Sequence, residues 1–114
     1  MSAITTHVLD ISSGSPARGI PVVLEQETPA AVWEHIGKGT TDDDGRLRDL
    51  LAPDTSLTPG NYRLTFDTGT YFAQQRIEGF YPQVIVAFTV RDAGAHYHVP
   101  LLLSPFGYST YRGS

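Results

Sequence analysis

Residues 95–114, AHYHVPLLLSPFGYSTYRGS, decide the fold class. Alternate side chains of a strand share a face, so His98 and Leu102 lie on one side of this segment while Val99 and Leu101 lie on the other. Both faces are therefore substantially apolar. Such a strand belongs at the centre of a sandwich or beneath a second subunit, and a chain of 114 residues offers only one core. We expect the face carrying His98 to be covered by another protomer.

The end of the same stretch points to assembly as well. The expected strand Gly107 to Arg112 alternates Tyr108 and Thr110 with Ser109 and Tyr111, and an unprotected edge of this kind invites pairing with another chain. Pro100 interrupts the preceding strand because proline cannot donate to the ladder. We interpret it as a local irregularity beside a site.

The rest of the chain repeats this pattern of short alternating segments separated by Gly, Pro and Asp, which is typical of an all-β, two-sheet antiparallel sandwich. We expect one domain over residues 1–114 with seven to eight strands. The expected strands are Ile4 to Ile11, Ile20 to Glu27, Trp33 to Gly39, Arg46 to Leu50, Tyr62 to Asp67, Val84 to Arg91, His96 to Ser104 and Gly107 to Arg112. The segment TYFAQQRIEGF at 70–80 predicts one short helix, with Gly79 as its cap.

Composition excludes several classes of protein. The 114 residues are 40% hydrophobic and 18% charged, as in an ordinary soluble globular protein, and no apolar run approaches the ~20 residues of a membrane span. A formal net charge of −4 argues against nucleic acid as a partner. With no cysteine there are no disulfides or thiolate sites, and MSAITTHVLD does not read as a secretory signal. The expected location is the cytoplasm.

Three histidines and two arginines are the candidate chemical groups. His96 and His98 share a strand face and, with His7, permit a three-histidine zinc site, but the sequence places no carboxylate or thiolate nearby. His96 on its own is a surface residue at a strand start. TDDDGR at 41–46 predicts an Asp-Gly turn from which Arg46 opens a strand, with Arg48 on the same face. A serine triad is disfavoured because no G-x-S-x-G elbow is present.

Taken together, four segments are more specific than any one of them. TTHVLD at 5–10, DGR at 44–46, HYHVPLLLSPFGY at 96–108 and YRGS at 111–114 resemble the transthyretin-related proteins that act as hydroxyisourate hydrolases, and the resemblance covers nearly the whole chain. It implies a transthyretin-like sandwich with one short helix, assembled as a homotetramer, a dimer of dimers, with sites in a channel between the dimers. The C-terminal tail is then folded into that channel.

The resemblance also implies a reaction and its residues. The reaction is hydrolysis of 5-hydroxyisourate to 2-oxo-4-hydroxy-4-carboxy-5-ureidoimidazoline in urate degradation, part of purine metabolism, with no cofactor. The catalytic residues carried over are His7, Arg46 and His98. Substrate binding falls to His7, Arg46, Tyr111 and Ser114.

The residues themselves suit these roles. Neutral imidazole is available near pH 7, so His98 with His7 activates the water, and the hydroxyl or carboxylate of Ser114 orients His98. Arg46 stabilises the oxyanion, and Tyr111 offers a ring face to a planar heterocycle. The main alternative is a transthyretin-like carrier of a small aromatic ligand, which has no need of a base paired with a guanidinium.

Overall fold

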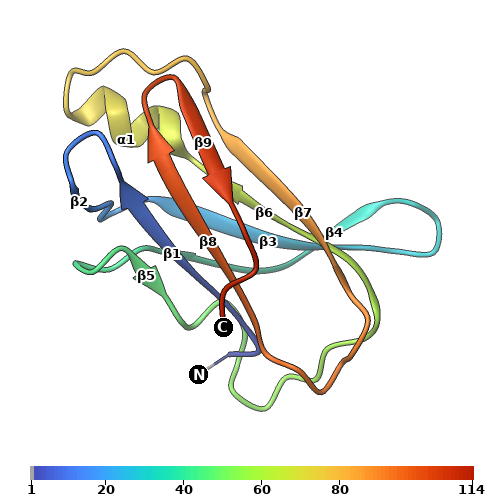
Figure 1. The fold of residues 1–114 in the computed structure, drawn as a ribbon. Helices are drawn as coiled ribbons and strands as arrows, with labels where there is room; N and C mark the ends of the chain where they lie inside the picture. Colours follow the sequence, from blue (N-terminus) through green and yellow to red (C-terminus); the bar gives the residue numbers. More distant parts are fainter. Residues whose placement is uncertain (1) are drawn as a thin grey trace.

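The computed structural model describes residues 2–114 and consists of two β-sheets packed face to face (Figure 1). The first sheet has the strand order β2-β1-β8-β9, and β5 also pairs with β1. Its strands are β1 (Ile4–Asp10), β2 (Ser15–Pro16), β5 (Arg46–Leu47), β8 (Tyr97–Ser104) and β9 (Gly107–Thr110). The second sheet, β4-β3-β6-β7, contains β3 (Pro21–Glu27), β4 (Trp33–Thr40), β6 (Gly60–Phe66) and β7 (Val84–Val90).

This architecture confirms the predicted sandwich, with differences in detail. The described residues form nine strands, because the two-residue β2 was not expected. β5 ends at Leu47, not at Leu50, since the chain leaves the sheet there and buries Leu50 and Leu51 in the core. All pairs are antiparallel except β1 and β8, which run parallel. The chain reaches β8 from β7, which lies in the second sheet. A connection that crosses between the sheets allows β8 to run parallel to β1, whereas a hairpin joins only antiparallel strands.

The core lies between the sheets and follows the alternation of the strands. β1 contributes Ile4 and Val8, and β8 contributes Leu101 and Leu103; all four side chains are 2% exposed or less. They meet buried residues of the second sheet: Val22, Leu24, Leu64, Phe66, Val84 and Val90. Burying each such side chain contributes about 1.5–3 kcal/mol relative to leaving it exposed. The opposite faces of β1 and β8 are thereby left to carry the site.

The helix α1 (Thr68–Gln74) was predicted, but its end was not. Asp67 caps its start by accepting a hydrogen bond from the Thr70 amide at 3.1 Å. The prediction that Gly79 caps the end is wrong: Arg76, with φ of 57°, takes the left-handed position, and the Ile77 amide donates to the Phe72 carbonyl at 3.0 Å. A Cβ on Gly79 would lie 3.0 Å from the Phe72 ring, so this glycine permits close packing.

The β8–β9 hairpin extends into the C-terminal tail with a gap. β9 ends at Thr110, short of the predicted Arg112, yet an isolated bridge joins His98 to Gly113 in the same register that pairs Leu101 with Thr110. The gap lies opposite Pro100, which has no amide hydrogen for the ladder. The interpretation of Pro100 as a local irregularity is therefore confirmed.

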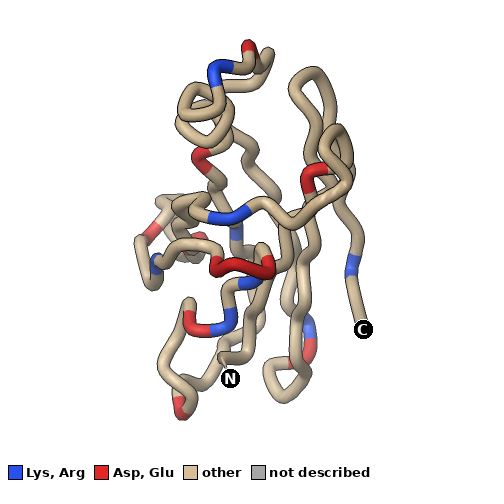
Figure 2. Tube along the Cα trace, turned by 90° about the vertical axis from the view of Figure 1, so that its left-hand side faces the viewer, with Lys and Arg blue, Asp and Glu red and all other residues tan. Residues whose placement is uncertain are grey.

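Charge is spread evenly over the fold. Figure 2 shows Lys and Arg interspersed with Asp and Glu along the trace, without a continuous basic stripe in the described part of the chain. Among residues 2–114, no helix is long and apolar enough to cross a membrane.

Candidate active site

Strand pairing brings three predicted residues onto the outer face of the first sheet. Thr5 of β1 faces His98 of β8 in the parallel register, and His7 of β1 faces Arg46 of β5 in the antiparallel one. Since Thr5 and His7 are two residues apart in β1, their side chains share a face. His7, Arg46 and His98, from distant parts of the sequence, therefore lie beside one another.

A hollow of about 300 Å³ opens on this face. Its lining residues are Thr5, Thr6, Arg46, Arg48, His96, His98 and Ser114. The volume lies at the lower end of the range for small-molecule sites. His7 lies beside the hollow without lining it.

The imidazole of His98 is held by one nitrogen. Its Nδ1 lies 2.8 Å from Oγ1 of the buried Thr5, while Nε2 has no hydrogen-bond partner within residues 2–114. Burial lowers the pKa of His98 from its ordinary value of 6.5, and the charges of Arg46, His7 and His96 lower it further. Near pH 7 the ring is neutral, with Nε2 available for proton transfer.

A turn places His7 and Arg46. Asp42 accepts hydrogen bonds from the amides of Asp44 and Arg46, each at 2.9 Å, and Gly45 adopts a left-handed φ of 74°. A Cβ on Gly45 would lie 2.3 Å from a β1 carbonyl, so the close approach requires glycine. His7 Nε2 lies 2.9 Å from the Asp44 carbonyl, which only accepts, so Nε2 of His7 carries the proton.

The tail closes one side of the hollow. The Gly113 amide donates to the His98 carbonyl at 2.8 Å, and Ser114 follows as a lining residue. Arg112 stacks on the Tyr97 ring, with its guanidinium carbon 4.5 Å from the ring centroid. The predicted site residue Ser114 thus lines the same hollow as His98. Its predicted role of orienting the His98 ring is filled in this structure by Thr5, because the ring is hydrogen-bonded to Thr5 and not to Ser114.

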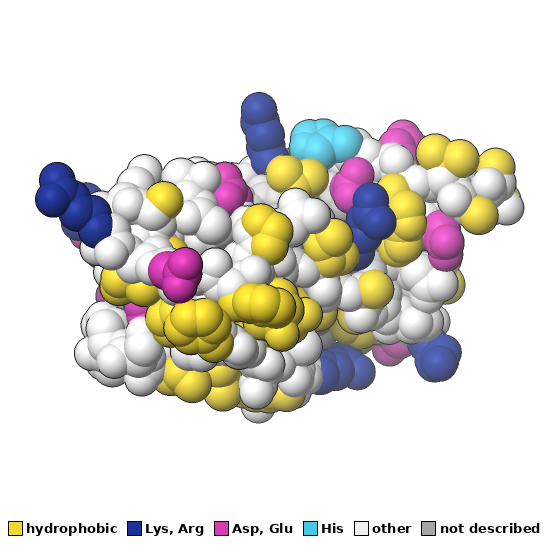
Figure 3. Space-filling view, turned by 90° about the horizontal axis from the view of Figure 1, so that it is seen from above, with side chains coloured by type: hydrophobic (Ala, Val, Ile, Leu, Met, Phe, Trp, Pro, Cys, Tyr) yellow, Lys and Arg dark blue, Asp and Glu magenta, His cyan; other side chains and the backbone are white. Residues whose placement is uncertain are grey.

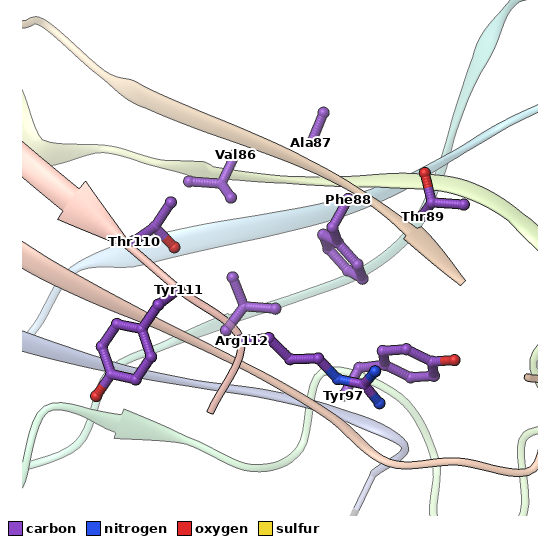
Figure 4. A pocket seen from close by; sticks show the side chains of 9 residues that line it. Val86, Ala87, Phe88, Thr89, Tyr97, Thr110, Tyr111 and Arg112 are labelled. Atoms are coloured by element: carbon purple, nitrogen blue, oxygen red, sulfur yellow. The ribbon is translucent and has the colours of Figure 1, made fainter. Parts of the chain in front are cut away.

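Tyr111 occupies a different position from the other predicted residues. It is 56% exposed and borders a second hollow between β7 and the tail, not the one lined by His98. Figure 4 shows its ring turned away from Phe88 and Arg112. The shared register places Tyr111 opposite Pro100, on the same outer face as His98. Its role in binding stays a prediction.

Sequence reasoning missed Thr5 and gave too small a role to His96. His96 is exposed, as predicted, yet its Nε2 lies 3.2 Å from Thr5 Oγ1 and it lines the hollow. The only signal for Thr5 was its place two residues before His7. No group of three His, Cys, Asp or Glu side chains in the described chain is arranged to hold a metal ion, so His7, His96 and His98 do not form a ligand set.

A family model described as "HIUase/Transthyretin family" matches residues 4–113. The chain belongs to the HIUase/Transthyretin family. A probable 5-hydroxyisourate hydrolase of Caenorhabditis elegans is 50% identical over 115 residues, covering 99% of this chain and 82% of the relative. The 5-hydroxyisourate hydrolase of Mus musculus is 46% identical over 114 residues, covering 99% of this chain and 96% of the relative.

Solved structures similar to this chain include a 5-hydroxyisourate hydrolase and a transthyretin. The Klebsiella pneumoniae 5-hydroxyisourate hydrolase has a TM-score of 0.85 at 38% identity, covering 97% of this chain and 98% of that one. Sea bream transthyretin in complex with thyroxine has a TM-score of 0.91 at 32% identity, with 97% and 94% covered. Backbone similarity therefore does not separate hydrolase from carrier in this family, and the side chains of the site must.

Proposed function

We propose that this chain is a hydrolase that opens the ring of 5-hydroxyisourate to give 2-oxo-4-hydroxy-4-carboxy-5-ureidoimidazoline, in urate degradation. Relatives that carry the name 5-hydroxyisourate hydrolase match it over nearly its whole length. The observation that carries the proposal is the free Nε2 of His98 in a hollow that also contains the Arg46 guanidinium. A base beside a fixed cation is what water attack on a ring carbonyl requires.

His98 and His7 are the proposed acid-base pair. His98 Nε2 accepts a proton from the attacking water as oxygen bonds to the carbonyl carbon. The carbon–nitrogen bond then breaks, and the pair of His98 and His7 returns this proton to the leaving nitrogen. Assistance of this kind contributes typically about 10²–10⁴ in rate.

Arg46 is proposed to bind substrate oxygens and to stabilise the oxyanion that forms on the attacked carbonyl. The proposed remaining contacts to substrate are the ring of Tyr111 on the outer face and Ser114 at the wall of the hollow. Neither the attack of water nor the cleavage of the carbon–nitrogen bond requires a cofactor in this proposal.

A homotetramer, a dimer of dimers, is the proposed assembly, with each site closed at the interface between dimers. Two observations support it. On the outer face of the first sheet, which also carries the hollow, Leu9 and Leu102 of the paired strands are only half-buried in the single chain. At the upper end, hydrophobic side chains gather on the surface (Figure 3). Phe80 and Tyr108 each pack against Tyr81 and are 67% and 40% exposed. Such surfaces mark contacts between subunits. The proposed location is the cytoplasm.

Production of 5-hydroxyisourate in place, from urate and urate oxidase, tests the function. The ultraviolet decay of the product is followed with and without this protein. Acceleration over the spontaneous decay is the expected result, and an unchanged decay contradicts the proposal.

A carrier is the second candidate, favoured by the TM-score of 0.91 to a transthyretin in complex with thyroxine. Calorimetric titration with thyroxine, beside the decay assay, separates the two. Tight binding without acceleration of the decay would favour the carrier.

A further inference from the structure

The hydroxyl of Thr5 lies between two imidazoles. Its Oγ1 is 2.8 Å from Nδ1 of His98 and 3.2 Å from Nε2 of His96, and the residue is 4% exposed. The two rings lie 6.5 Å apart between centroids at an interplanar angle of 14°. No other hydrogen-bond partner of this hydroxyl is present in the described chain, so it serves the two histidines alone.

The single hydrogen of the Thr5 hydroxyl couples the protonation of the two imidazole rings. A hydroxyl has one hydrogen, so Thr5 donates to one imidazole and accepts from the other. When His98 holds its hydrogen on Nδ1 and donates to Thr5, the Thr5 hydroxyl donates to His96, and His98 Nε2 is a base. When the two hydrogen bonds run in the opposite direction, the Thr5 hydroxyl donates to His98 Nδ1. His98 Nε2 then carries a hydrogen and is an acid. The state of His96 thereby sets the state of His98.

Hydrolysis creates a need for such a connection. Water supplies an oxygen to the carbonyl carbon and one hydrogen to the leaving nitrogen, and the carboxylic acid formed ionises near pH 7 because carboxyl pKa values lie near 4. One proton must therefore leave the site in each turnover. His98 is half-buried at the hollow, while His96 is exposed.

We propose that Thr5 and His96 form a proton relay that connects His98 to solvent. The relay rests on the proposed hydrolytic function. After His98 Nε2 has accepted a proton, Nδ1 passes its own proton to Thr5 Oγ1, whose hydrogen moves to Nε2 of His96. His96 then loses the proton from Nδ1 to water, which leaves His98 neutral with its hydrogen on Nε2 and Thr5 donating to Nδ1. Once the product has left, Nε2 releases this proton to water in the hollow while the hydrogen bonds shift back and His96 Nδ1 takes up a proton, so that one proton has left in total and His98 is a base again. Thr5 acts as a positioning residue, because it acts on the reaction through His98.

The surrounding charges drive the proton outward. Arg46 and Arg48 line the same hollow as His98, and His7 lies on the neighbouring strand. Burial and the charges of Arg46, His7 and His96 hold the pKa of His98 below its ordinary value, so an imidazolium at this position loses its proton readily. At the outer end, the tail fixes His96 only through its backbone, with Arg112 Nη2 3.5 Å from the His96 carbonyl.

Variants at Thr5 test the chain of hydrogen bonds. Thr5→Val keeps the branched shape in the buried strand and removes the hydroxyl, whereas Thr5→Ser keeps the hydroxyl. We expect kcat of Thr5→Val to fall about tenfold or more, within the range for acid-base assistance, with KM within about twofold of wild type. Thr5→Ser should retain most of the activity. Equal kcat in Thr5→Val and wild type would overturn the proposal.

His96→Gln tests proton transfer itself, because glutamine can hydrogen-bond to Thr5 but does not titrate. We expect a lowered kcat that free imidazole in the buffer restores as an alternative proton carrier, with no such effect on wild type. A His96→Gln variant with wild-type kcat and no response to imidazole would overturn the relay.

A spectroscopic measurement separates failure of the relay from failure of the proposed function. Nitrogen-15 NMR of the imidazoles reports which ring nitrogen of His98 carries the hydrogen, without any substrate. We expect one dominant tautomer of His98 in wild type and in Thr5→Ser, and a mixture in Thr5→Val. If wild type does not accelerate the decay of 5-hydroxyisourate, the function fails while this result still stands. An unchanged tautomer in Thr5→Val would contradict the coupling in either case.

Discussion

Gly113 lies against the ring of His98 so closely that a Cβ at this position would be 2.6 Å from His98 Cδ2. The same glycine would bring its Cβ within 3.3 Å of Pro100 Cγ, and its amide donates to the His98 carbonyl. We expect Gly113→Ala to displace either the tail or the imidazole. Since misplacement of a reacting group by about 1 Å costs about 10²-fold, kcat/KM should fall by that order in the decay assay.

Gly107→Ala is the matched control for Gly113→Ala. A Cβ at Gly107 would have Ser104 Oγ at 3.7 Å as its nearest neighbour, an ordinary van der Waals contact, and the backbone there is not left-handed. Turnover close to wild type is expected. Equal activity of the two variants would show that contact between Gly113 and His98 does not matter for catalysis.

Removal of the Arg46 guanidinium should affect turnover without affecting the fold. The Arg46 backbone, not its side chain, is held by Asp42, so Arg46→Ala keeps the turn. We expect kcat/KM to fall about 10²–10³-fold, as for loss of one oxyanion stabiliser. Arg18→Ala is the control, because Arg18 pairs only with Asp43 on the surface, where its side chain is 74% exposed. A twofold change or less in Arg46→Ala, with circular dichroism unchanged, would remove Arg46 from the mechanism.

The pH dependence of kcat/KM should show the lowered pKa of His98. A histidine base is active when neutral, so activity is present above this pKa and is lost as the pH falls through it. We expect the midpoint of the acid limb below 6.5, because burial and neighbouring charges lower the pKa. Arg46→Ala, which removes one of these charges, should move the limb of the remaining activity upward. His98→Asn should abolish the loss of activity at acid pH. If the acid limb persists in the residual activity of His98→Asn, another group is responsible for it.

Much of this site follows from strand alternation. Five of the eight expected strands begin at the residue where the structure begins them, namely Ile4, Trp33, Arg46, Val84 and Gly107. The division of β8 into two faces was correct as well, since side chains of a strand alternate regardless of their partners. Alternation therefore placed His98 on the face opposite the core.

What alternation does not reveal is which strands are neighbours. The position of Thr5 opposite His98 results from the parallel pairing of β1 with β8, which are separated by most of the chain. No local pattern specifies such a long-range register. The end of α1 was misplaced for a different reason: Gly79 is the residue expected at a helix end, but Arg76 is held in the left-handed position by the bond from Ile77 to Phe72. Tertiary contacts there outweigh local preference.

Stability should depend on a buried carboxylate at the end of β1. Burial by itself raises the pKa of Asp10, but hydrogen bonds from Ser12, Tyr71 and Ser13 outweigh it and hold the pKa below 3.8. Tyr71 donates at 2.7 Å and so connects β1 to α1. We expect Asp10→Asn to lower the free energy of unfolding by about 1–3 kcal/mol at pH 7, measured in urea.

The sign of the pH effect follows from the lowered pKa of Asp10. Stabilisation by the carboxylate is present above the unfolded-state value near 3.8 and is lost as the pH falls through the folded-state value. The difference between wild type and Asp10→Asn should therefore narrow in acid. Asp54→Asn, in an exposed loop, is the control and should be neutral at both pH values. A constant difference across this range would mean that the charge of Asp10 is not what stabilises the fold.

Deletion of residues 111–114 should separate the site from the fold. The core ends with Leu103 in β8, and β9 ends at Thr110, so the deletion removes no buried hydrophobic residue. It removes the stacking of Arg112 on Tyr97, worth about 0.5–1 kcal/mol at an exposed position, and one backbone hydrogen bond to His98.

The same deletion removes Ser114 from the wall of the hollow and the tail that anchors the backbone of His98. We expect turnover to fall about 10²-fold or more, by the cost of a misplaced reacting group, while circular dichroism and the mass from light scattering stay those of wild type. Replacing Tyr111 alone with Phe, which keeps the backbone of the tail, shows how much of the loss belongs to the phenol. A shortened chain with full activity would mean that the tail builds no part of the site, whereas an unfolded one would mean that its contacts stabilise the sandwich more than their number suggests.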